Sequence, residues 1–280
     1  MTKDQTQKLS VLITGCSTGI GYDTAITLSK LGYQVFATAR KQTDVDKLTA
    51  LGLHAHLLDL THESSIDNAL SWVLAQTGGL LYGLFNNGAY GQAGAIEDLP
   101  LKALKLQFDT NFFGWHYLTQ QVIPVMRKQG FGRIIQNSSV LGLVAMPYRG
   151  AYNASKFAIE GYTDTLRLEL KNSGIQVVLI EPGPIDTQFR ANALAKTLEY
   201  IDVESSVHKN SYKVQLDRLS KKGPSNKFTL PASAVTAKVV HALSSKKAKT
   251  RYYVTKATYI MALLKRILPY SWLDKILIKG

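Results

Sequence analysis

Cysteine is almost missing from this chain of 280 residues, because Cys16 is the only one. A single cysteine excludes an internal disulfide and a zinc site built from cysteines, so the fold depends on its hydrophobic core. The chain has no run near 18 consecutive apolar residues, so we expect no membrane span. No apolar signal-peptide core follows the polar start, and we expect a cytoplasmic protein.

Acidic residues are also scarce, because 20 Asp and Glu stand against 33 Lys and Arg for a formal net charge of +13. Residues 246–280 hold nine Lys or Arg and one acidic residue, Asp274, so most of the excess lies there. Such an excess can attract nucleic acid, an anionic cofactor or an acidic membrane surface. Since the charge sits in an apolar tail without a recognisable nucleic-acid-binding module, we expect no nucleic-acid partner.

Short apolar runs rich in β-branched residues alternate with longer amphipathic segments. The expected strands are 9–14, 34–39, 54–60, 81–86, 133–138, 175–181 and 251–255, and the expected helices are 17–31, 43–51, 63–77, 100–128, 151–172 and 232–245. Nearly all-apolar strands are typical of a parallel sheet that helices cover on both faces. The sequence therefore predicts one doubly wound α/β domain of about seven strands over residues 1–255.

Two segments differ from this alternation. Residues 187–230 are long, polar and weakly periodic, which is typical of an active-site lid or of a disordered insert. Residues 256–280 form a basic amphipathic C-terminal extension that Pro269 interrupts. We expect Ile260, Leu263, Leu264, Ile267 and Leu268 on one helical face.

Three glycines, Gly15, Gly19 and Gly21, stand between the first expected strand and the first expected helix. Glycines at such a turn let the backbone approach a pyrophosphate, which free N–H groups at the helix start can bind. The spacing G-x3-G-x-G differs from the G-x-G-x-x-G of the dinucleotide fingerprint. A tight packing turn is the alternative interpretation.

Tyr152 and Lys156 lie four residues apart on an expected helix, which places both side chains on one face. Tyr252 and Lys256 have the same spacing, but on an expected strand, where four residues span about 13 Å. Ser139 follows the strand over 133–138, at the carboxyl end where doubly wound sheets place their sites. A lysine cation, together with the positive nicotinamide ring of an oxidised cofactor, would lower the pKa of the tyrosine from its ordinary value of about 10 and make it a useful base.

In order and spacing, these motifs resemble the short-chain dehydrogenase/reductase family over residues 10–255. The resemblance is carried by residues 14–21, Asp59, Asn86-Asn87-Gly88-Ala89, Asn111, Ser139, Tyr152, Lys156 and Pro182-Gly183 with Thr187. The family usually has Asn-Asn-Ala-Gly, so we expect a local shift at Gly88 and Ala89 without loss of function. The resemblance implies a single Rossmann-type sheet and hydride transfer between a nicotinamide dinucleotide and a carbonyl or alcohol.

The resemblance also implies the roles of individual residues. Tyr152 would exchange the proton, Lys156 would bind the nicotinamide ribose and Ser139 would donate a hydrogen bond to the substrate oxygen. Asn111 would hold a proton-relaying water, or it is a helix amide bonded to backbone. The expected cofactor contacts are Gly15, Ser17, Thr18, Gly19, Ile20, Gly21, Arg40, Asp59, Leu60, Asn87, Gly88, Tyr152, Lys156, Pro182, Gly183, Ile185 and Thr187.

The residues after the second strand indicate which dinucleotide is used. Ala39 stands where NAD-dependent members of the family have an acidic residue, and Arg40 follows it. Ala39 cannot repel a 2′-phosphate, and the Arg40 guanidinium can bind one through two charge-assisted hydrogen bonds. We therefore expect NADP(H), with a merely solvated Arg40 as the alternative.

The remaining candidates are weaker. His54, His56 and His62 cluster without a cysteine or carboxylate pair, so we expect no metal site. Cys16 could be a thiol activated at a helix start, but a small residue lining the phosphate path is the favoured interpretation.

The extension bears on the substrate and on partners. It can lie on an anionic membrane surface as a peripheral contact, or it can cover the substrate cleft or a subunit interface. An apolar tail near the site favours a lipophilic substrate such as a steroid, retinoid, long-chain aldehyde or acyl ketone, and the family resemblance implies a homodimer or homotetramer. A non-catalytic dinucleotide-binding redox sensor or membrane-associated scaffold is the alternative function, which the complete catalytic set disfavours.

Overall fold

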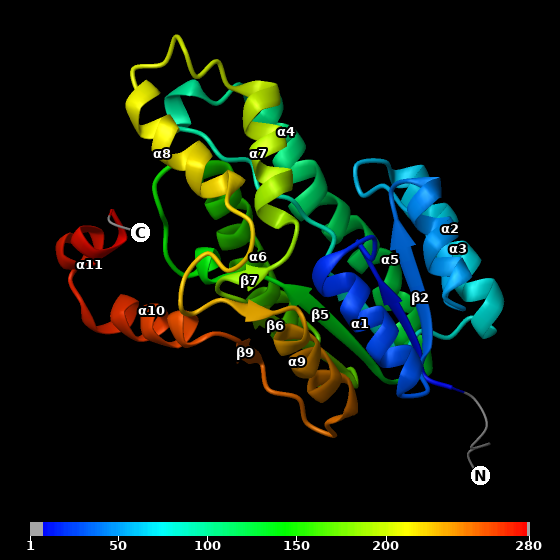
Figure 1. Ribbon diagram of the computed structural model, residues 1–280. Coiled ribbons are helices and arrows are strands. Elements are labelled where there is room, and N and C mark those ends of the chain that lie inside the picture. The colour runs from blue at the N-terminus through cyan, green and yellow to red at the C-terminus, as the bar shows by residue number, and fades with distance from the viewer. Residues whose placement is uncertain (1–7, 279–280) are drawn as a thin grey trace.

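A seven-stranded parallel sheet forms the centre of the computed structural model, which describes residues 8–278 (Figure 1). The strand order is β3-β2-β1-β4-β5-β6-β9. The strands are β1 Ser10–Ile13, β2 Gln34–Ala39, β3 His54–Leu57, β4 Gly83–Asn86, β5 Gly132–Asn137, β6 Ile175–Glu181 and β9 Arg251–Tyr253. The sheet reverses its order between β1 and β4, which confirms the doubly wound fold.

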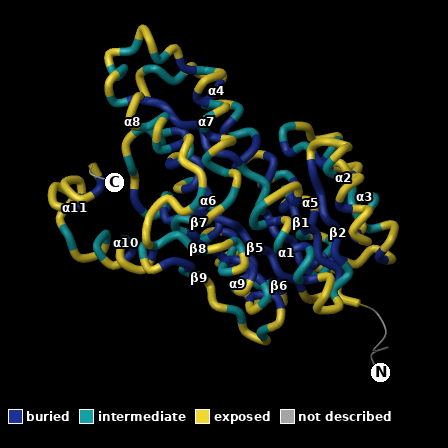
Figure 2. The backbone as a smooth tube through the Cα atoms, in the orientation of Figure 1, coloured by how far each residue is buried: buried dark blue, intermediate teal, exposed yellow. Residues whose placement is uncertain are grey.

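Helices cover both faces because successive strand residues point in opposite directions. Val11 and Ile13 of β1 pack with α1 (Gly19–Lys30), α2 (Gln42–Ala50) and α9 (Ser233–Ser244). Leu12 packs on the other face with α3 (Glu63–Thr77), α5 (Gly114–Gln129) and α6 (Gly150–Glu169). The central strands are buried on both sides, as the dark blue tube shows (Figure 2). This double burial explains the nearly continuous apolar runs of the sequence.

The helix expected over 100–128 is one element with a wider turn inside it. It comprises α4 (Leu101–Phe108), a π-helical turn at Asp109–Phe113 and α5. π-helical turns inside helices are frequent at functional sites, and this one contains Asn111.

Residues 187–230 fold largely as helices, so the disordered-insert alternative is wrong. They contain α7 (Phe189–Tyr200) and α8 (Lys209–Ser220), which lie side by side above the sheet (Figure 1). A short parallel pair joins β7 (Ile185–Asp186) to β8 (Leu230–Pro231) at the two ends of this segment. We refer to residues 187–230 as the lid.

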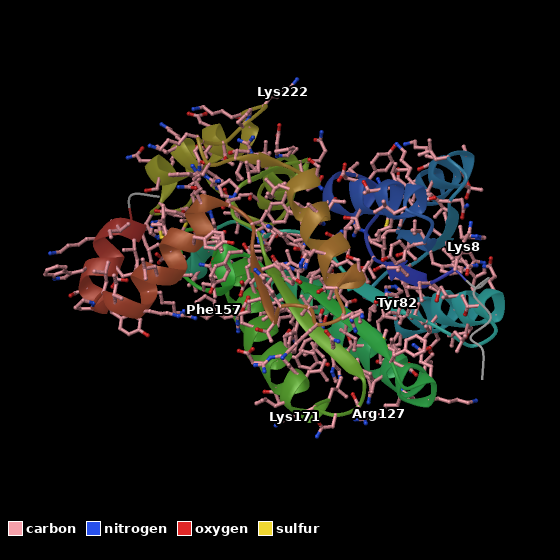
Figure 3. The ribbon with its side chains drawn as sticks, turned by 90° about the horizontal axis from the view of Figure 1, so that it is seen from below. Lys8, Tyr82, Arg127, Phe157, Lys171 and Lys222 are labelled. Atoms are coloured by element: carbon pink, nitrogen blue, oxygen red, sulfur yellow. The ribbon has the colours of Figure 1, made fainter. Side chains whose placement is uncertain are left out.

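The extension forms α10 (Lys256–Ile267) and α11 (Tyr270–Leu277), with the break at Pro269. Phe157 of α6 lies beside this part of the chain (Figure 3), and its ring centroid is 4.6 Å from Lys265 Nζ of α10. No helix within residues 8–278 is long and apolar enough to cross a membrane.

The expectation that the apolar residues of α10 share one face is wrong. Leu264 and Leu268 turn inward and pack with Val140 and Val144, together with Leu273 and Leu277 of α11. Ile260, Leu263 and Ile267 remain exposed on the outer side. The physical reason is that residues 260, 263 and 267 form one helical stripe, whereas 261, 264 and 268 form the neighbouring one.

Candidate active site

The glycine-rich turn follows β1 and depends on the absence of side chains. Gly15 and Gly19 have φ angles of 71° and 62°, in the left-handed region that favours glycine. A Cβ on Gly21 would lie 2.3 Å from the carbonyl oxygen of Gly15. The turn can therefore close against the start of α1 only with these residues.

The turn is bound to the segment that follows β4. Thr14 Oγ1 accepts hydrogen bonds from the backbone N–H groups of Asn87 (2.9 Å) and Gly88 (2.8 Å). Asn87 Nδ2 donates to Thr14 O (3.0 Å), while Asn87 Oδ1 accepts from Asn137 Nδ2 at 2.9 Å. Gly88 O accepts from the indole N–H of Trp115 at 2.9 Å. These bonds bring the ends of three strands to one edge of the sheet.

The start of α1 suits a bound anion. Thr18 is the N-cap residue and makes no side-chain cap, and the first turn has no acidic residue. The first N–H groups of the helix, which form the positive end of its dipole, therefore have no carboxylate of their own turn to neutralise them. An open pocket of about 380 Å³ lies here, lined by Ser17, Thr18, Gly19, Tyr22, Asp186, Thr187 and Gln188. These residues fit the phosphate groups of a dinucleotide.

The residues that the sequence analysis expects to contact the adenosine half of the cofactor lie at the same edge of the sheet as the glycine-rich turn. Ala39 is buried at the end of β2, whereas Arg40 is exposed and forms no ion pair with any residue from 8 to 278. Asp59 Oδ1 accepts from the N–H (2.9 Å) and the hydroxyl (2.8 Å) of Thr61. Leu60 packs against Gly88, because a Cβ on Gly88 would lie 3.3 Å from Leu60 Cδ1.

Ser139, Tyr152 and Lys156 come together beyond the carboxyl end of β5. Ser139 caps a short 3-10 turn, where its Oγ accepts from the Leu141 N–H at 3.1 Å. Tyr152 and Lys156 lie on one side of α6, and Lys156 Nζ is 5.6 Å from the centroid of the Tyr152 ring. Lys156 Nζ donates to Asn137 O at 2.6 Å and lies 4.5 Å from the Trp115 ring centroid.

Burial shifts the pKa values of Tyr152 and Lys156. Burial raises the pKa of Tyr152 to about 12, and its hydrogen bond with Ser139 opposes this effect. Burial lowers the pKa of Lys156 to about 7, against the attraction of Glu160. Desolvation dominates in the chain alone, where Lys156 Nζ is directed at Asn137 O. The lowering of the tyrosine pKa by the lysine together with a bound oxidised cofactor stays a prediction.

Asn111 is fully buried in the π-helical turn, beside the part of α6 that carries Tyr152 and Lys156. Its Nδ2 donates to Tyr90 O at 2.9 Å and its Oδ1 accepts from the Tyr90 N–H at 3.2 Å. Nδ2 is also within 3.4 Å of Ser155 Oγ. This amide is bonded to backbone, as the alternative interpretation held, and its role in a proton relay stays a prediction.

The expected cofactor contacts between residues 182 and 187 lie where the lid begins. Val140 N donates to Pro182 O at 2.7 Å, so the turn after β6 is held beside the turn after Ser139. A Cβ on Gly183 would lie 2.0 Å from Thr255 Oγ1, which requires glycine there. Thr187 packs on the glycine-rich turn, since a Cβ on Gly19 would lie 3.1 Å from Thr187 Cγ2.

Sequence reasoning missed Phe189, the first residue of α7. Its ring packs edge-on against Tyr152, with the centroids 5.3 Å apart. A Cβ on Gly91 would lie 2.7 Å from Phe189 Cζ, so Gly91 makes room for this ring. The lid thus touches the tyrosine directly, and the position of Phe189 two residues after Thr187 is the signal that could have found it.

A second missed feature is an ion-pair network behind Lys156. Ser138 Oγ donates to Glu160, which pairs with Arg251 of β9. Arg251 also pairs with Glu181 and, at 2.5 Å, with Asp164. Burial and the nearby Glu160 raise the pKa of Glu181 to about 8. Glu160 lies one helical turn after Lys156, and this spacing could have identified it.

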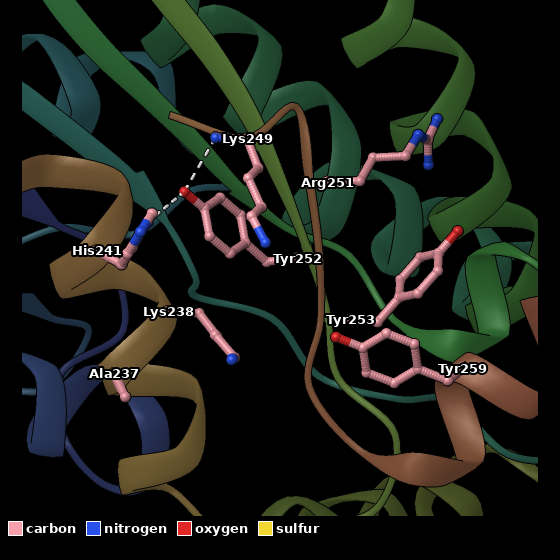
Figure 4. Close-up of a pocket in the computed structure, with 8 residues that line it drawn as sticks. All are labelled: Ala237, Lys238, His241, Lys249, Arg251, Tyr252, Tyr253 and Tyr259. Carbon is pink, nitrogen blue, oxygen red and sulfur yellow. Dashed lines mark hydrogen bonds between the residues drawn. The ribbon is translucent and has the colours of Figure 1, made fainter. Parts of the chain in front are cut away.

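Tyr252 and Lys256 do not form a catalytic pair. Tyr252 borders a pocket of about 330 Å³ between α9 and β9 that contains none of the expected catalytic residues (Figure 4). Its hydroxyl hydrogen-bonds His241 Nδ1 at 2.8 Å and accepts from the Lys249 N–H at 3.1 Å. Lys256 is exposed at the start of α10.

Cys16, His54 and His56 pack in the interior or against aromatic rings. Cys16 is fully buried in the core, and burial raises the pKa of its thiol to about 12, so it neither is activated nor lines the phosphate path. His54 stacks on Phe36 and His56 packs against Trp72. Within the described range 8–278, no group of three or more His, Cys, Asp or Glu could hold a metal ion.

Comparison with known proteins agrees with this geometry. The family model described as short chain dehydrogenase matches residues 9–197. The chain belongs to the short-chain dehydrogenase/reductase family. One relative in this family is an uncharacterized oxidoreductase, YbbO, of Escherichia coli, which is 44% identical over 268 residues that cover 96% of this chain and 93% of that protein.

Two further relatives in the short-chain dehydrogenase/reductase family carry more specific names. Human retinol dehydrogenase 8 is 38% identical over 197 residues, which cover 67% of this chain and 62% of that protein. An NADPH-dependent 3-dehydrocapnine reductase of Ornithobacterium rhinotracheale is 31% identical over 277 residues, which cover 96% and 95%. Among solved structures, a short chain dehydrogenase/reductase of Burkholderia phymatum in complex with NAD has the same fold, with a TM-score of 0.78, 23% identity and 96% and 95% coverage.

Proposed function

We propose that the protein is an NADP(H)-dependent oxidoreductase that interconverts a carbonyl and an alcohol on a lipophilic substrate. The observation that carries the proposal is the meeting of Ser139, Tyr152 and Lys156 at the edge of the sheet that also holds the glycine-rich turn. A nicotinamide dinucleotide is the cofactor of this family, and when bound it supplies or accepts the hydride.

The chain's own residues then handle the substrate oxygen and its proton. The hydroxyls of Ser139 and Tyr152 hydrogen-bond the carbonyl oxygen and fix its position. Tyr152, which its raised pKa keeps protonated, donates its proton to the alkoxide that forms. Lys156 can supply a replacement proton, because a pKa of about 7 leaves protonated and neutral forms in comparable amounts near neutral pH.

The choice of NADP(H) rests on Ala39 and Arg40. Ala39 offers no carboxylate to repel a 2′-phosphate, and the exposed Arg40 guanidinium has no ion-pair partner within the described chain. One relative is named as NADPH-dependent, which supports the proposal, although NAD is bound to the Burkholderia structure. Ser17, Thr18 and Gly19 would hold the phosphates at the start of α1.

A lipophilic substrate is supported by the apolar surroundings of the site. Val140, which directly follows Ser139, and Val144 form an apolar cluster with Leu273 and Leu277 of α11. Phe189 of the lid covers Tyr152. Retinol dehydrogenase is also among the relatives.

The test is a substrate screen that follows NADPH and NADH absorbance with aldehydes, ketones and alcohols of increasing chain length. The proposal expects turnover with NADPH that improves with chain length. Dinucleotide binding without turnover of any compound would favour the sensor or scaffold alternative, and a preference for NADH would contradict the cofactor assignment.

We also infer that the outer face of α10 and α11 contacts an anionic membrane surface. This face exposes Leu263, Ile267 and Trp272, with 58%, 62% and 62% of their surface accessible. Arg266 and Lys275 are exposed on the same two helices, and an apolar face with neighbouring cations complements anionic lipid.

A further inference from the structure

Three arginines from separate elements lie in or beside the lid, whose Phe189 contacts Tyr152. Arg149 immediately precedes α6 and lies three residues before Tyr152. Arg190 follows Phe189, whose ring contacts Tyr152. Arg218 lies on α8, next to Leu219, which packs in a cluster with Ala193 of α7. Arg218 is close enough to both other guanidinium groups for the charges to interact. We call Arg149, Arg190 and Arg218 the arginine cluster.

No carboxylate of the described chain neutralises the arginine cluster. All three residues are half-buried, and none forms an ion pair within residues 8–278. Arg190 Nη2 donates to the Gly223 carbonyl, whereas its Nη1 is buried without any hydrogen-bond partner. Arg251 shows the opposite case, because its guanidinium engages three carboxylates.

The remaining polar contacts of the cluster are weak. Arg218 Nε donates to Gln215 Oε1 at 3.1 Å, and Arg149 Nη1 contacts Met146 Sδ at 2.7 Å. The nearby carboxylate of Asp98 is occupied by the hydroxyls of Ser206 (2.6 Å) and Tyr212 (2.8 Å). Most of the hydrogen-bonding capacity of three guanidinium groups is therefore unused.

The electrostatics show that this arrangement is unfavourable by itself. Burial, together with the smaller effect of the Arg218 charge, lowers the pKa of Arg149 to about 10. Burial and the charge of Arg190 also lower the pKa of Arg218. Half-buried like charges destabilise a fold unless an anion offsets them.

We propose that the arginine cluster binds an anionic end group, a phosphate or a carboxylate, of the lipophilic substrate whose carbonyl lies at Tyr152. Guanidinium groups bind both oxyanions through paired, charge-assisted hydrogen bonds. Because α7 and α8 carry two of the three arginines, binding of the anion also holds the lid over the substrate. This inference rests on the proposed function and selects an acidic long-chain aldehyde or acyl ketone over a neutral steroid or retinoid.

The kinetic test compares decanal with 10-oxodecanoate and with the phosphate monoester of 10-hydroxydecanal. The wild-type protein should show a higher kcat/KM for at least one of the two charged compounds than for decanal. The charged compound with the higher kcat/KM identifies the oxyanion that the cluster prefers. Arg190→Gln and Arg218→Gln should each reduce kcat/KM for that compound about tenfold or more while leaving decanal nearly unchanged. Lys222→Gln, which removes an exposed charge on the loop after α8 (Figure 3), is the matched control and should change neither.

A binding measurement separates this inference from the proposed function. Hexyl phosphate, with hexanol as the neutral control, should raise the Tm of the wild-type protein and have no such effect on Arg190→Gln or Arg218→Gln. This result would support the anion site even if no carbonyl compound were turned over. Equal losses on decanal and the charged compounds, or a selective loss of NADPH affinity, would overturn the assignment.

Discussion

The glycine-rich edge and the lid satisfy their polar groups in opposite ways. At the glycine-rich edge, Thr14, Asn87 and Asn137 hydrogen-bond one another across three strand ends. In and beside the lid, a buried Arg190 nitrogen has no hydrogen-bond partner, and Arg149 and Arg218 form no ion pair within the described chain. The edge residues therefore bind mainly one another, with Asn137 Oδ1 left without a partner among the described residues. The arginine cluster would instead gain its partners from the anion of the proposed substrate.

The largest expected effect concerns Tyr152 of α6, which contacts Phe189 of the lid. Tyr152→Phe should lower kcat by about 10²-fold or more, because only the proton donor is lost. Its affinity for NADPH, measured by fluorescence titration, should stay close to that of the wild-type protein. Tyr252→Phe is the matched control, since that hydroxyl bonds only His241 and the Lys249 backbone among the described groups. Near-normal turnover in Tyr152→Phe would mean that the catalytic assignment is wrong.

The glycine-rich edge is the region that sequence predicts well. Residues 14–21 of its glycine-rich turn are adjacent in the chain, and local backbone geometry demands particular residue types there, as the positive φ angles of Gly15 and Gly19 show. Tyr152 and Lys156 are likewise related by one helical turn, so their meeting followed from spacing alone.

The lid could not be predicted in the same way. Arg149 and Arg218 lie 69 positions apart in the chain, and the tertiary packing of α8 beside the segment before α6 brings them together, where the Tyr148 and Tyr212 ring centroids are 5.7 Å apart. The pKa values of Tyr152 and Lys156 also depend on desolvation by distant residues such as Phe189. The division of the apolar residues of α10 into an inner and an outer stripe could not be predicted either. It depends on contacts with Val140 and Val144, which lie far away in the sequence.

The next expected effect tests the cofactor edge. Arg40→Asp should reverse the preference for NADPH over NADH, because the new carboxylate repels a 2′-phosphate and can accept hydrogen bonds from ribose hydroxyls. The ratio of kcat/KM values for the two dinucleotides measures this, with an expected change of about tenfold or more. Lys47→Asp, an exposed change of the same charge on α2, should leave the ratio unchanged. A wild-type protein that prefers NADH would disprove the assignment.

A third effect follows from the buried Lys156. Its pKa in the folded chain is about 7 against an ordinary 10.5, so between these values the unfolded chain binds more protons and stability rises with pH. From pH 7 to pH 9 this contribution should approach about 2 kcal/mol. Lys156→Met should lack that gain, while groups such as Glu160 and Tyr152 remain in both proteins. Urea unfolding of both proteins without dinucleotide measures the difference, and parallel pH profiles would contradict the lowered pKa.

The smallest expected effect concerns the outer face of the extension. Deleting α10 and α11 would uncover Val140 and Val144 beside Ser139, so outward-facing substitutions give the cleaner test. Leu263→Glu with Trp272→Glu should reduce sedimentation with vesicles containing phosphatidylserine about threefold or more, because each buried apolar group contributes to membrane affinity. Added salt should weaken wild-type binding, since Arg266 and Lys275 attract the anionic surface through screened charges. Decanal turnover without vesicles should be unchanged, because both side chains are exposed and neither belongs to the apolar cluster around Val140 and Val144. Salt-insensitive or absent vesicle binding, together with a smaller oligomer in the double variant, would assign this face to a second copy of the chain instead.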